Sequence, residues 1–308
     1  MNQNKITEEQ LKDDSVYYSN EANWQYLSVS QYKDFIACES CALAKLKGDW
    51  DAISNPLPLL VGNYVHSYFE SKEAHEKFIR DNAGLITKDP TVADLKKELD
   101  KLGLDYKKSA TKPELIKSFE GNPLPIGGLL NDFTKANKYI EKVENDPLFQ
   151  LLWQGEKETV ITGELFGETW KGKIDLLNVE QGYFIDLKTT AKMNQRYWST
   201  TYGGWVSFVD QYRYGLQLAV YEKLLEKRYG KPFTGYIFAV SKEDIPDIAA
   251  IDIIDVKKEF EMDLLQQTIE QVIEVKTGQR EPESCGKCDY CKTYKKLDGF
   301  VYSDELID

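Results

Sequence analysis

Two consecutive β-prone segments, residues 171–177 and 183–190, constrain the fold of this chain more than any other part of the sequence. The short glycine-containing stretch between them is typical of a hairpin turn. Each segment is apolar apart from one aspartate, Asp175 in the first and Asp186 in the second, and Lys188 follows two residues later. Because side chains alternate along a strand, Asp186 and Lys188 share one face. The sequence therefore predicts a hairpin that holds two carboxylates and a lysine together.

Carboxylates inside an apolar hairpin cost free energy unless a partner or a metal ion compensates their charge, and this requirement indicates what they do. A buried charge must be paired or bound to a metal, and two carboxylates held side by side repel each other. A divalent cation removes that repulsion, and a nearby lysine can orient water or stabilise charge on a phosphate. The pattern of Asp175, Asp186 and Lys188 therefore indicates a metal-dependent phosphodiesterase site. A D-x-K tripeptide is common by itself, so the hairpin and the spacing are what make the pattern informative.

Composition limits the class of protein. The chain has 308 residues, 42% of them apolar and 29% charged, which is typical of a globular protein with one elaborate domain or two smaller ones. No apolar run approaches the ~20 residues of a membrane span, and the N-terminus does not have the pattern of a signal peptide, so we expect a cytoplasmic protein without a membrane partner. The net charge of −12 argues against a broad nucleic-acid-binding surface but is compatible with DNA held in a narrow channel.

Periodicity along the chain predicts an α/β protein. A buried helix over 59–70 carries Gly62, His66 and Glu70 on one face. A lone histidine in such a helix is either a core residue or, close to an aspartate pair, a metal ligand. The other predicted helices span 31–38, 41–46, 130–143, 208–227 and 256–275, and the predicted strands span 158–165, 168–178, 183–190, 234–240 and 250–255.

The segment 88–120 differs from its surroundings and reads as an insertion. Helices over 91–103 and 111–119 flank a short extended stretch, which resembles the small helix–extension–helix modules of the SAP and HeH type. In such a module the phosphate contacts would be lysines; the alternative is a solvated helical hairpin. The candidate contacts are Lys101, Lys107, Lys108, Lys112 and Lys117.

At this point the chain resembles the PD-(D/E)xK nuclease superfamily, within it the RecB-like branch and the RecE-type phage exonucleases (exodeoxyribonuclease VIII-like). That branch has a histidine helix, a G-x-x-D strand, a D-x-K-T strand and a Q-x-x-x-Y helix. The same motifs occur here in that order, as Gly62…His66, Gly172-Lys173-Ile174-Asp175, Asp186-Leu187-Lys188-Thr189 and Gln217…Tyr221. The likeness covers about 27–80 and 125–297. It implies a restriction-endonuclease-like α/β core, with a central mixed sheet flanked by helices and a small inserted helical module.

The resemblance also implies roles for these residues. His66, Asp175, Asp186 and the backbone carbonyl of Leu187 would hold Mg²⁺ or Mn²⁺. Lys188 would position the attacking water and offset charge on the scissile phosphate. Gln217 and Tyr221 would hydrogen-bond near that lysine or the DNA backbone, or else serve as a capping and a core residue. Relatives often have a ligand glutamate on the first helix, but Glu70 is not assigned as one.

The five cysteines form a second pattern. Cys285, Cys288 and Cys291 follow a C-x₂-C-x₂-C spacing that can hold one metal centre if a fourth ligand is supplied by Cys38 or Cys41. Some RecB-like nucleases hold their ends together around a [4Fe–4S] cluster with one N-terminal and three C-terminal cysteines. The last interval is shorter here, so zinc is the alternative, and free thiols are the third.

The loop over 191–204 and the residues after it are rich in aromatic side chains. Trp198 and Trp205 are candidates for stacking on unpaired DNA bases or for an oligomer contact.

The predicted organisation has four parts. These are a polar, partly ordered N-terminal segment (1–26), a nuclease domain (27–297), the inserted module (88–120) and a C-terminal tail (298–308).

The predicted function is metal-dependent exonucleolytic hydrolysis of linear double-stranded DNA. By the resemblance it runs from a 5′ end, leaves a 3′ overhang for a RecT-like single-strand annealing partner, and involves a homo-oligomer. Alternatives are a RecB-like endonuclease, a nuclease subunit of a DNA-processing complex, and a non-catalytic DNA-binding relative.

Overall fold

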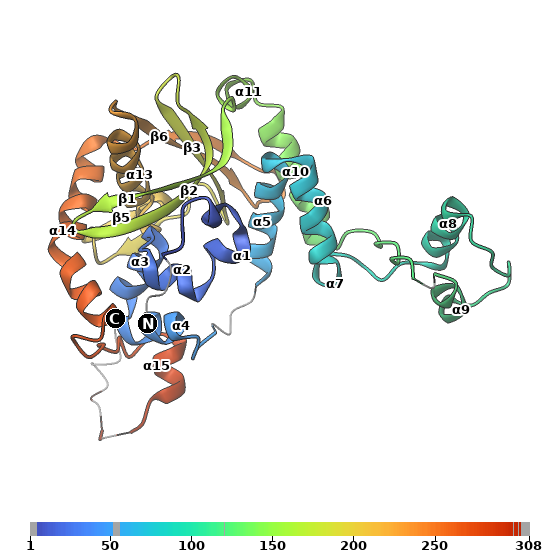
Figure 1. Cartoon of the computed structure of the whole chain (residues 1–308), viewed down its shortest axis with the longest axis horizontal. Coiled ribbons are helices and arrows are strands. Elements are labelled where there is room, and N and C mark those ends of the chain that lie inside the picture. Colours follow the sequence, from blue (N-terminus) through green and yellow to red (C-terminus); the bar gives the residue numbers. More distant parts are fainter. Residues whose placement is uncertain (1–4, 52–55, 120, 298, 301, 303–308) are drawn as a thin grey trace.

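The fold is built on a mixed five-stranded sheet (Figure 1). A computed structural model describes residues 5–51, 56–119, 121–297, 299–300 and 302. Helices cover the sheet, which confirms the predicted α/β class and the predicted three-stranded meander. In sheet order the strands are β1 (Glu156–Leu165), β2 (Glu168–Asn178), β3 (Tyr183–Thr190), β6 (Thr234–Ser241) and β7 (Ile248–Asp252).

The sheet changes from antiparallel to parallel pairing between β3 and β6. Short turns link β1 to β2 and β2 to β3, and Gly182 occupies the second turn with a φ of 73°. β6 runs parallel to β3, so the chain must return along the sheet between them. Helix α13 (Tyr214–Tyr229) makes this return. The connection puts α13 against the sheet beside the strand that carries Asp186.

The predicted helix over 208–227 is wrong in one respect, because it is two helices. The short α12 (Phe208–Gln211) ends before Arg213, whose backbone is left-handed with a φ of 51°, and α13 begins after it. The Arg213 guanidinium lies 2.6 Å from the fully buried carboxylate of Glu261. That ion pair anchors the residue at which the chain turns, and the periodicity of the sequence does not predict the break.

Two apolar cores occupy the two faces of the sheet. One lies beneath α3 (Val29–Ala37), α4 (Glu39–Lys47), α13 and α14 (Asp255–Lys276). The other lies beneath α5 (Leu57–Glu70), α10 (Asn131–Glu144) and α11 (Pro147–Leu152). Strands β2, β3 and β6 contribute to both cores, as expected for central strands buried on both faces. The site helix α5 is thus fixed to the sheet by its own apolar side.

The expectation of a partly ordered N-terminal segment is wrong for the described residues. Residues 10–25 form η1 (Gln10–Lys12), α1 (Asp14–Tyr17) and α2 (Asn20–Gln25). Leu11, Tyr17 and Ala22 are buried against Val160 of β1. Their apolar side chains are spaced too irregularly to show a period, but together they cover the outer part of the first strand.

The inserted module projects from the body of the molecule at the end of two extended arms (Figure 1). It contains the two predicted helices as α8 (Val92–Leu102) and α9 (Lys112–Lys117), and both begin with a capping box. Leu95, Leu99, Leu115 and Phe119 form a core that is separate from those of the sheet. The arms are joined where Lys88 N–H donates to the Gly128 carbonyl at 2.8 Å.

Several smaller differences from the sequence predictions concern element ends. The fifth strand is Ile248–Asp252 and not 250–255, because Asp255 already begins α14. The predicted loop over 191–204 contributes to a small hairpin, β4 (Tyr197–Ser199) and β5 (Gly204–Val206). The remaining helices are α6 (Lys72–Asp81), α7 (Ala83–Ile86) and α15 (Asp289–Tyr294).

Most of the predicted tail 298–308, residue 120 of the module and residues 1–4 lie outside the described residues. Within the described part of the chain, no helix is both long and apolar enough to cross a membrane.

We predict that Gly172→Ala destabilises the protein through a core clash. A Cβ at this position of β2 would lie 2.5 Å from Cε1 of the buried Tyr221 ring. Such overpacking in a core costs about 1–3 kcal/mol. The free energy of unfolding, measured by denaturant titration, should fall by that amount. Gly204→Ala is the matched control, because a Cβ there meets nothing within 4 Å. Equal stability of the two variants would contradict the prediction.

Candidate active site

The site forms where strands β2 and β3 separate. Their backbone ladder pairs Leu176 with Ile185, and the next step in the same register would pair Asp175 with Asp186. At that step the Asp175 Oδ2 atom instead accepts a hydrogen bond from Leu187 N–H at 2.6 Å. A carboxylate therefore takes the place of the backbone ladder, which brings the two aspartates to neighbouring positions. The two aspartates therefore lie close enough to influence each other's charge, as the sequence predicts, although the strands are not paired at these two residues.

Helix α5 places His66 against the first aspartate. The His66 Nδ1 atom lies 3.5 Å from Asp175 Oδ2. Gly62, one turn earlier, lets the helix approach β3 closely, since a Cβ there would lie 3.3 Å from Thr189 Oγ1. Burial lowers the pKa of His66, but the Asp175 carboxylate raises it by more than burial lowers it. The pKa of His66 therefore lies above its ordinary value. Burial conversely raises the pKa of Asp175, while His66 and Lys188 bring it below the ordinary value.

Asp186 is held between two side chains. The Lys188 Nζ atom lies 2.6 Å from Asp186 Oδ2, and Gln217 Nε2 of α13 donates to Asp186 Oδ1 at 2.8 Å. Burial lowers the pKa of Lys188, but Asp186 and Asp175 raise it more, so the pKa lies above its ordinary value and the amine stays protonated. The structure thus places Lys188 as a fixed positive charge, and Gln217 as the group that orients Asp186.

The side chains of His66, Asp175 and Asp186 are suitable ligands for a divalent cation, although their ligand atoms are not all close to one point. Asp186 Oδ2 is buried and has no partner with hydrogen-bond geometry, despite the nearby Lys188 amine. Burial raises the pKa of Asp186, and the neighbouring Asp175 raises it as well. Hard carboxylate oxygens beside an imidazole are ligands for Mg²⁺ or Mn²⁺. Among the described residues, however, the three-or-more-residue ligand group within 4.8 Å is the cysteine group and not this one.

Glu158 of β1 is a site residue that the sequence analysis missed. The pairs Lys157–Leu176 and Thr159–Ile174 flank it, so the register of β1 and β2 places it near Asp175, although it is not itself paired there and its backbone is left-handed with a φ of 51°. Burial and the neighbouring Asp175 raise the pKa of Glu158 to about 7. Glu158, Asp175 and Asp186 therefore form one acidic row across three strands. Counting residues outward from the β1–β2 turn would have found it.

Lys33 of α3 was also missed. Its Nζ atom donates to the Tyr212 carbonyl at 3.0 Å and lies 5.7 Å from the Tyr214 ring centroid, while Lys188 lies 5.1 Å from the same ring. Burial and the positive charge of Lys188 lower the pKa of Lys33 to about 8. A second lysine therefore stands beside Lys188, on a helix more than 100 residues away in sequence.

Tyr221 lies in the core and not at the site surface. Its ring packs against Gly172 and lies 6.1 Å from the Phe184 ring. Burial raises the pKa of Tyr221 above its ordinary value. Of the two roles considered for the Q-x-x-x-Y pair, Gln217 contacts a site carboxylate and Tyr221 supports the strand beneath it.

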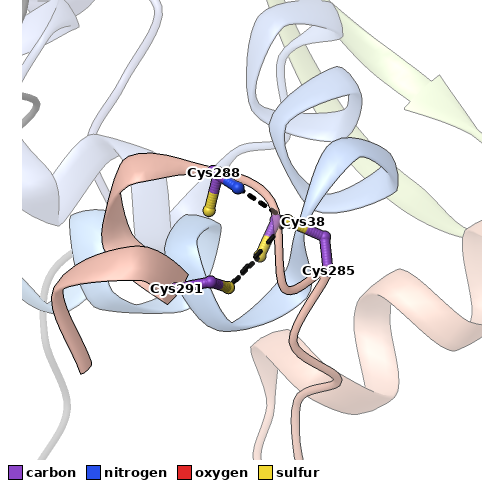
Figure 2. A group of neighbouring side chains, drawn as sticks. All are labelled: Cys38, Cys285, Cys288 and Cys291. Carbon is purple, nitrogen blue, oxygen red and sulfur yellow. Dashed lines mark hydrogen bonds between the residues drawn. The ribbon is translucent and has the colours of Figure 1, made fainter. Parts of the chain in front are cut away.

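The structure brings four of the five cysteines together where the C-terminal segment meets the start of α4 (Figure 2). Cys38, Cys285, Cys288 and Cys291 have sulfur atoms within 4.8 Å of one another, whereas Cys41 is outside this group. Of the two candidates for the fourth ligand, the geometry therefore selects Cys38. Burial opposes ionisation of Cys285, but backbone N–H groups of Lys287 and Cys288 lower its pKa to about 6.

The weaker DNA-binding candidates lie in two places. Trp198 and Trp205 are exposed on the β4–β5 hairpin, with ring centroids 5.7 Å apart. A series of aromatic contacts connects this hairpin through Tyr197, Tyr212 and Tyr214 to Lys188. The module lysines lie on the projecting arm, apart from the sheet (Figure 1). Lys107, Lys108 and Lys117 are exposed and Lys112 is half-buried.

Comparison with known families decides the classification. Residues 28–294 match the family model described as "PDDEXK-like domain of unknown function (DUF3799)". The chain belongs to this PDDEXK-like family. The match covers both the carboxylate row and the cysteine group, so the PD-(D/E)xK nuclease resemblance is confirmed at the level of the superfamily.

One solved structure shares the fold over nearly the whole length. It is a protein from Eubacterium rectale described as a "Putative exonuclease", with 29% identity and a TM-score of 0.76. The alignment covers 96% of this chain and 97% of that one. A structure named SSO0001 has 16% identity and a TM-score of 0.26, over 64% of this chain and 90% of that one, which is too low to indicate a shared fold. No curated protein matches the chain.

We predict that the positively charged amine of Lys33 lowers the stability of this PDDEXK-like domain at pH 7. Because the folded-state pKa of about 8 is below the ordinary lysine value, the ionised amine costs stability at pH 7. That cost disappears as the pH rises through 8 towards the ordinary value. Lys33→Met should therefore raise the free energy of unfolding at pH 7 by on the order of 1 kcal/mol after solvent screening, with a smaller gain at pH 10.

Thermal unfolding at the two pH values measures this difference. Lys223→Met, which removes an exposed lysine from α13, is the matched control and should keep the wild-type pH dependence. A Lys33→Met variant that is less stable at pH 7 than at pH 10, relative to wild type, would contradict the prediction.

Proposed function

We propose that the protein is a metal-dependent exonuclease that hydrolyses linear double-stranded DNA. The observation that carries the proposal is the Lys188 amine fixed 2.6 Å from Asp186 beside the Asp175–His66 pair. A protonated lysine next to two carboxylates matches the charge pattern of phosphodiester hydrolysis, in which a cation and an ammonium stabilise developing phosphate charge. The PDDEXK-like family and the exonuclease name of the Eubacterium rectale protein support the same chemistry.

The metal ligands of the proposed enzyme are His66, Asp175, Asp186 and the Leu187 backbone carbonyl. Asp186 Oδ2 contacts the Lys188 amine but has no partner with hydrogen-bond geometry, and the raised pKa of that carboxyl also supports this assignment, since a cation would stabilise the charged form. Bound Mg²⁺ or Mn²⁺ would polarise the phosphoryl oxygen and lower the pKa of a bound water.

The chain's own side chains divide the remaining work. Lys188 positions the attacking water and offsets phosphate charge, because its amine remains protonated. Gln217 keeps Asp186 in place through the 2.8 Å hydrogen bond. Lys33 adds a second positive charge on the same side as Lys188 and Tyr214, where a DNA strand would approach. Binding of a phosphate there would also relieve the low pKa of Lys33.

The finer parts of the proposal concern the substrate and its use. Cleavage from a 5′ end, leaving a 3′ overhang for a RecT-like annealing protein in phage-type recombination, follows from the RecE-type resemblance. A homo-oligomer that surrounds DNA has the same support. The exposed tryptophan pair on the hairpin would stack on bases at an opened end, and the aromatic contacts that link the hairpin to Lys188 support this role.

The catalytic assignment is tested by Lys188→Ala. Digestion of linear duplex in Mg²⁺ should slow by at least about 100-fold, as expected when a group that stabilises transition-state charge is removed. Lys223→Ala is the matched control, because it removes an exposed lysine of α13 and should retain wild-type activity. Equal digestion by wild type and Lys188→Ala would show that the site is assigned wrongly. Omission of the divalent cation should abolish activity in both active proteins.

The end dependence is tested with matched linear and closed circular duplexes labelled at one strand end. An exonuclease degrades the linear form and releases the 5′ label first, while the circle survives. Cleavage of closed circles would support the RecB-like endonuclease alternative. DNA binding without any cleavage would support the non-catalytic one.

We predict that the module lysines add substrate affinity and not rate. Changing Lys107, Lys108, Lys112 and Lys117 to Gln should raise KM for DNA and leave kcat unchanged, because the module lies away from the carboxylate row. Each lost phosphate contact should also reduce the slope of log K against log salt by about 0.9. Unchanged KM and salt slope would show that the module is a solvated helical hairpin.

A further inference from the structure

The C-terminal segment 280–294 is attached to the start of α4 mainly through polar contacts. Arg280 pairs with Glu39, and Glu39 also accepts from Glu283 N–H at 2.8 Å. Ser40 N–H donates to the Glu283 carbonyl at 3.0 Å. Within this segment, Cys291 is the residue that belongs to the buried apolar core, and the Tyr290 and Tyr294 ring centroids lie 5.4 and 6.2 Å from that of Trp50. These few apolar contacts bury little surface, which leaves room for a further source of cohesion.

The four thiols supply that source if they share one metal ion. The Cys38 and Cys291 sulfurs are 3.6 Å apart and those of Cys285 and Cys291 are 3.9 Å apart, with all four within 4.8 Å of one another. With Zn–S bonds of about 2.3 Å, tetrahedral geometry separates two sulfurs by about 3.8 Å. In Figure 2 the sulfurs of the C-terminal segment converge on that of Cys38, at the start of α4.

A [4Fe–4S] cluster does not fit these distances. In such a cluster each thiolate binds a different iron, so two sulfurs are separated by two Fe–S bonds and an iron–iron edge. That arrangement spreads the thiolates further apart than the closest pairs here, at 3.6 and 3.9 Å. The shorter C-x₂-C interval between the last two cysteines agrees with the tighter grouping.

We propose that Cys38, Cys285, Cys288 and Cys291 bind a single tetrahedral zinc ion that holds the C-terminal segment against α4. The backbone supports the ligand set, because Lys287 N–H and Cys288 N–H donate to the Cys285 sulfur at 3.5 and 3.3 Å. Such hydrogen bonds stabilise a thiolate and orient it towards a metal. The site is separate from the carboxylate row, so this proposal does not depend on the proposed nuclease activity.

The chain contains its own control. Cys41 lies one helical turn from Cys38 on α4 but outside the four-sulfur group. Removing it changes the number of thiols without changing the ligand set. Cys38→Ser and Cys288→Ser each remove one ligand, the first from the N-terminal side of the site and the second from the C-terminal side.

The experiment measures metal content of the full chain, expressed in medium that contains both iron and zinc and purified without oxygen. Wild type and Cys41→Ser should each carry about one zinc per chain and no visible iron–sulfur absorption. Cys38→Ser and Cys288→Ser should lose at least about nine-tenths of the zinc. Both ligand variants should also be cut faster by protease within 280–294. Circular dichroism verifies that they remain folded.

The result that overturns the proposal is equally distinct. Iron in the wild-type protein, whether one atom or four per chain, would exclude zinc as the resident ion. A metal-free wild type, or thiols blocked as disulfides, would exclude a metal site. Zinc lost from Cys41→Ser as well would show that the ion is not held by these four cysteines alone and would overturn the proposed ligand set. Replacing zinc with Co²⁺ gives a second readout, since four thiolates around one ion produce intense visible bands.

Discussion

The site depends on one hydrogen bond that interrupts a sheet. Where β2 and β3 separate, the Asp175 carboxylate accepts the Leu187 N–H that would otherwise bond to the neighbouring strand. This substitution brings a charged group into the interior of a sheet without leaving a backbone donor unsatisfied. It also fixes the distance between the two aspartates, because Asp186 is the residue before that donor. The other site groups are arranged around this opening.

Side chains from the surrounding elements offset the negative charge of the two aspartates. His66 from α5 and Lys188 from β3 pair with the two aspartates, and Gln217 from α13 satisfies the remaining Asp186 oxygen. Glu158 adds a third carboxylate, and burial together with the neighbouring Asp175 charge raises its pKa. A bound divalent ion would relieve the repulsion along the whole row. The charge balance of the site thus supports the proposed metal dependence.

The two ends of the chain are organised by a different force from the centre. Strands β2, β3 and β6 are held by two apolar cores, whereas segment 280–294 contacts α4 through ion pairs, backbone hydrogen bonds and four converging thiols. Cys38 lies between α3 and α4, so the cysteine group adjoins the helix that carries Lys33. A zinc ion at the cysteines would therefore help to hold the part of the chain next to α3 without taking part in the chemistry of the site. The inserted module has a core of its own and depends on neither.

Much of this arrangement follows from the sequence because its determinants are local. The alternation of the β-prone segments placed Asp186 and Lys188 on one face near Asp175, and the two helices of the module were also predicted from the sequence. The tertiary structure alone decided the contacts between distant segments. It selected Cys38 over Cys41, turned Tyr221 into the core, brought Lys33 beside Lys188 and folded the N-terminal residues onto β1. Periodicity specifies which face of an element is buried, but only packing between elements decides which buried faces meet.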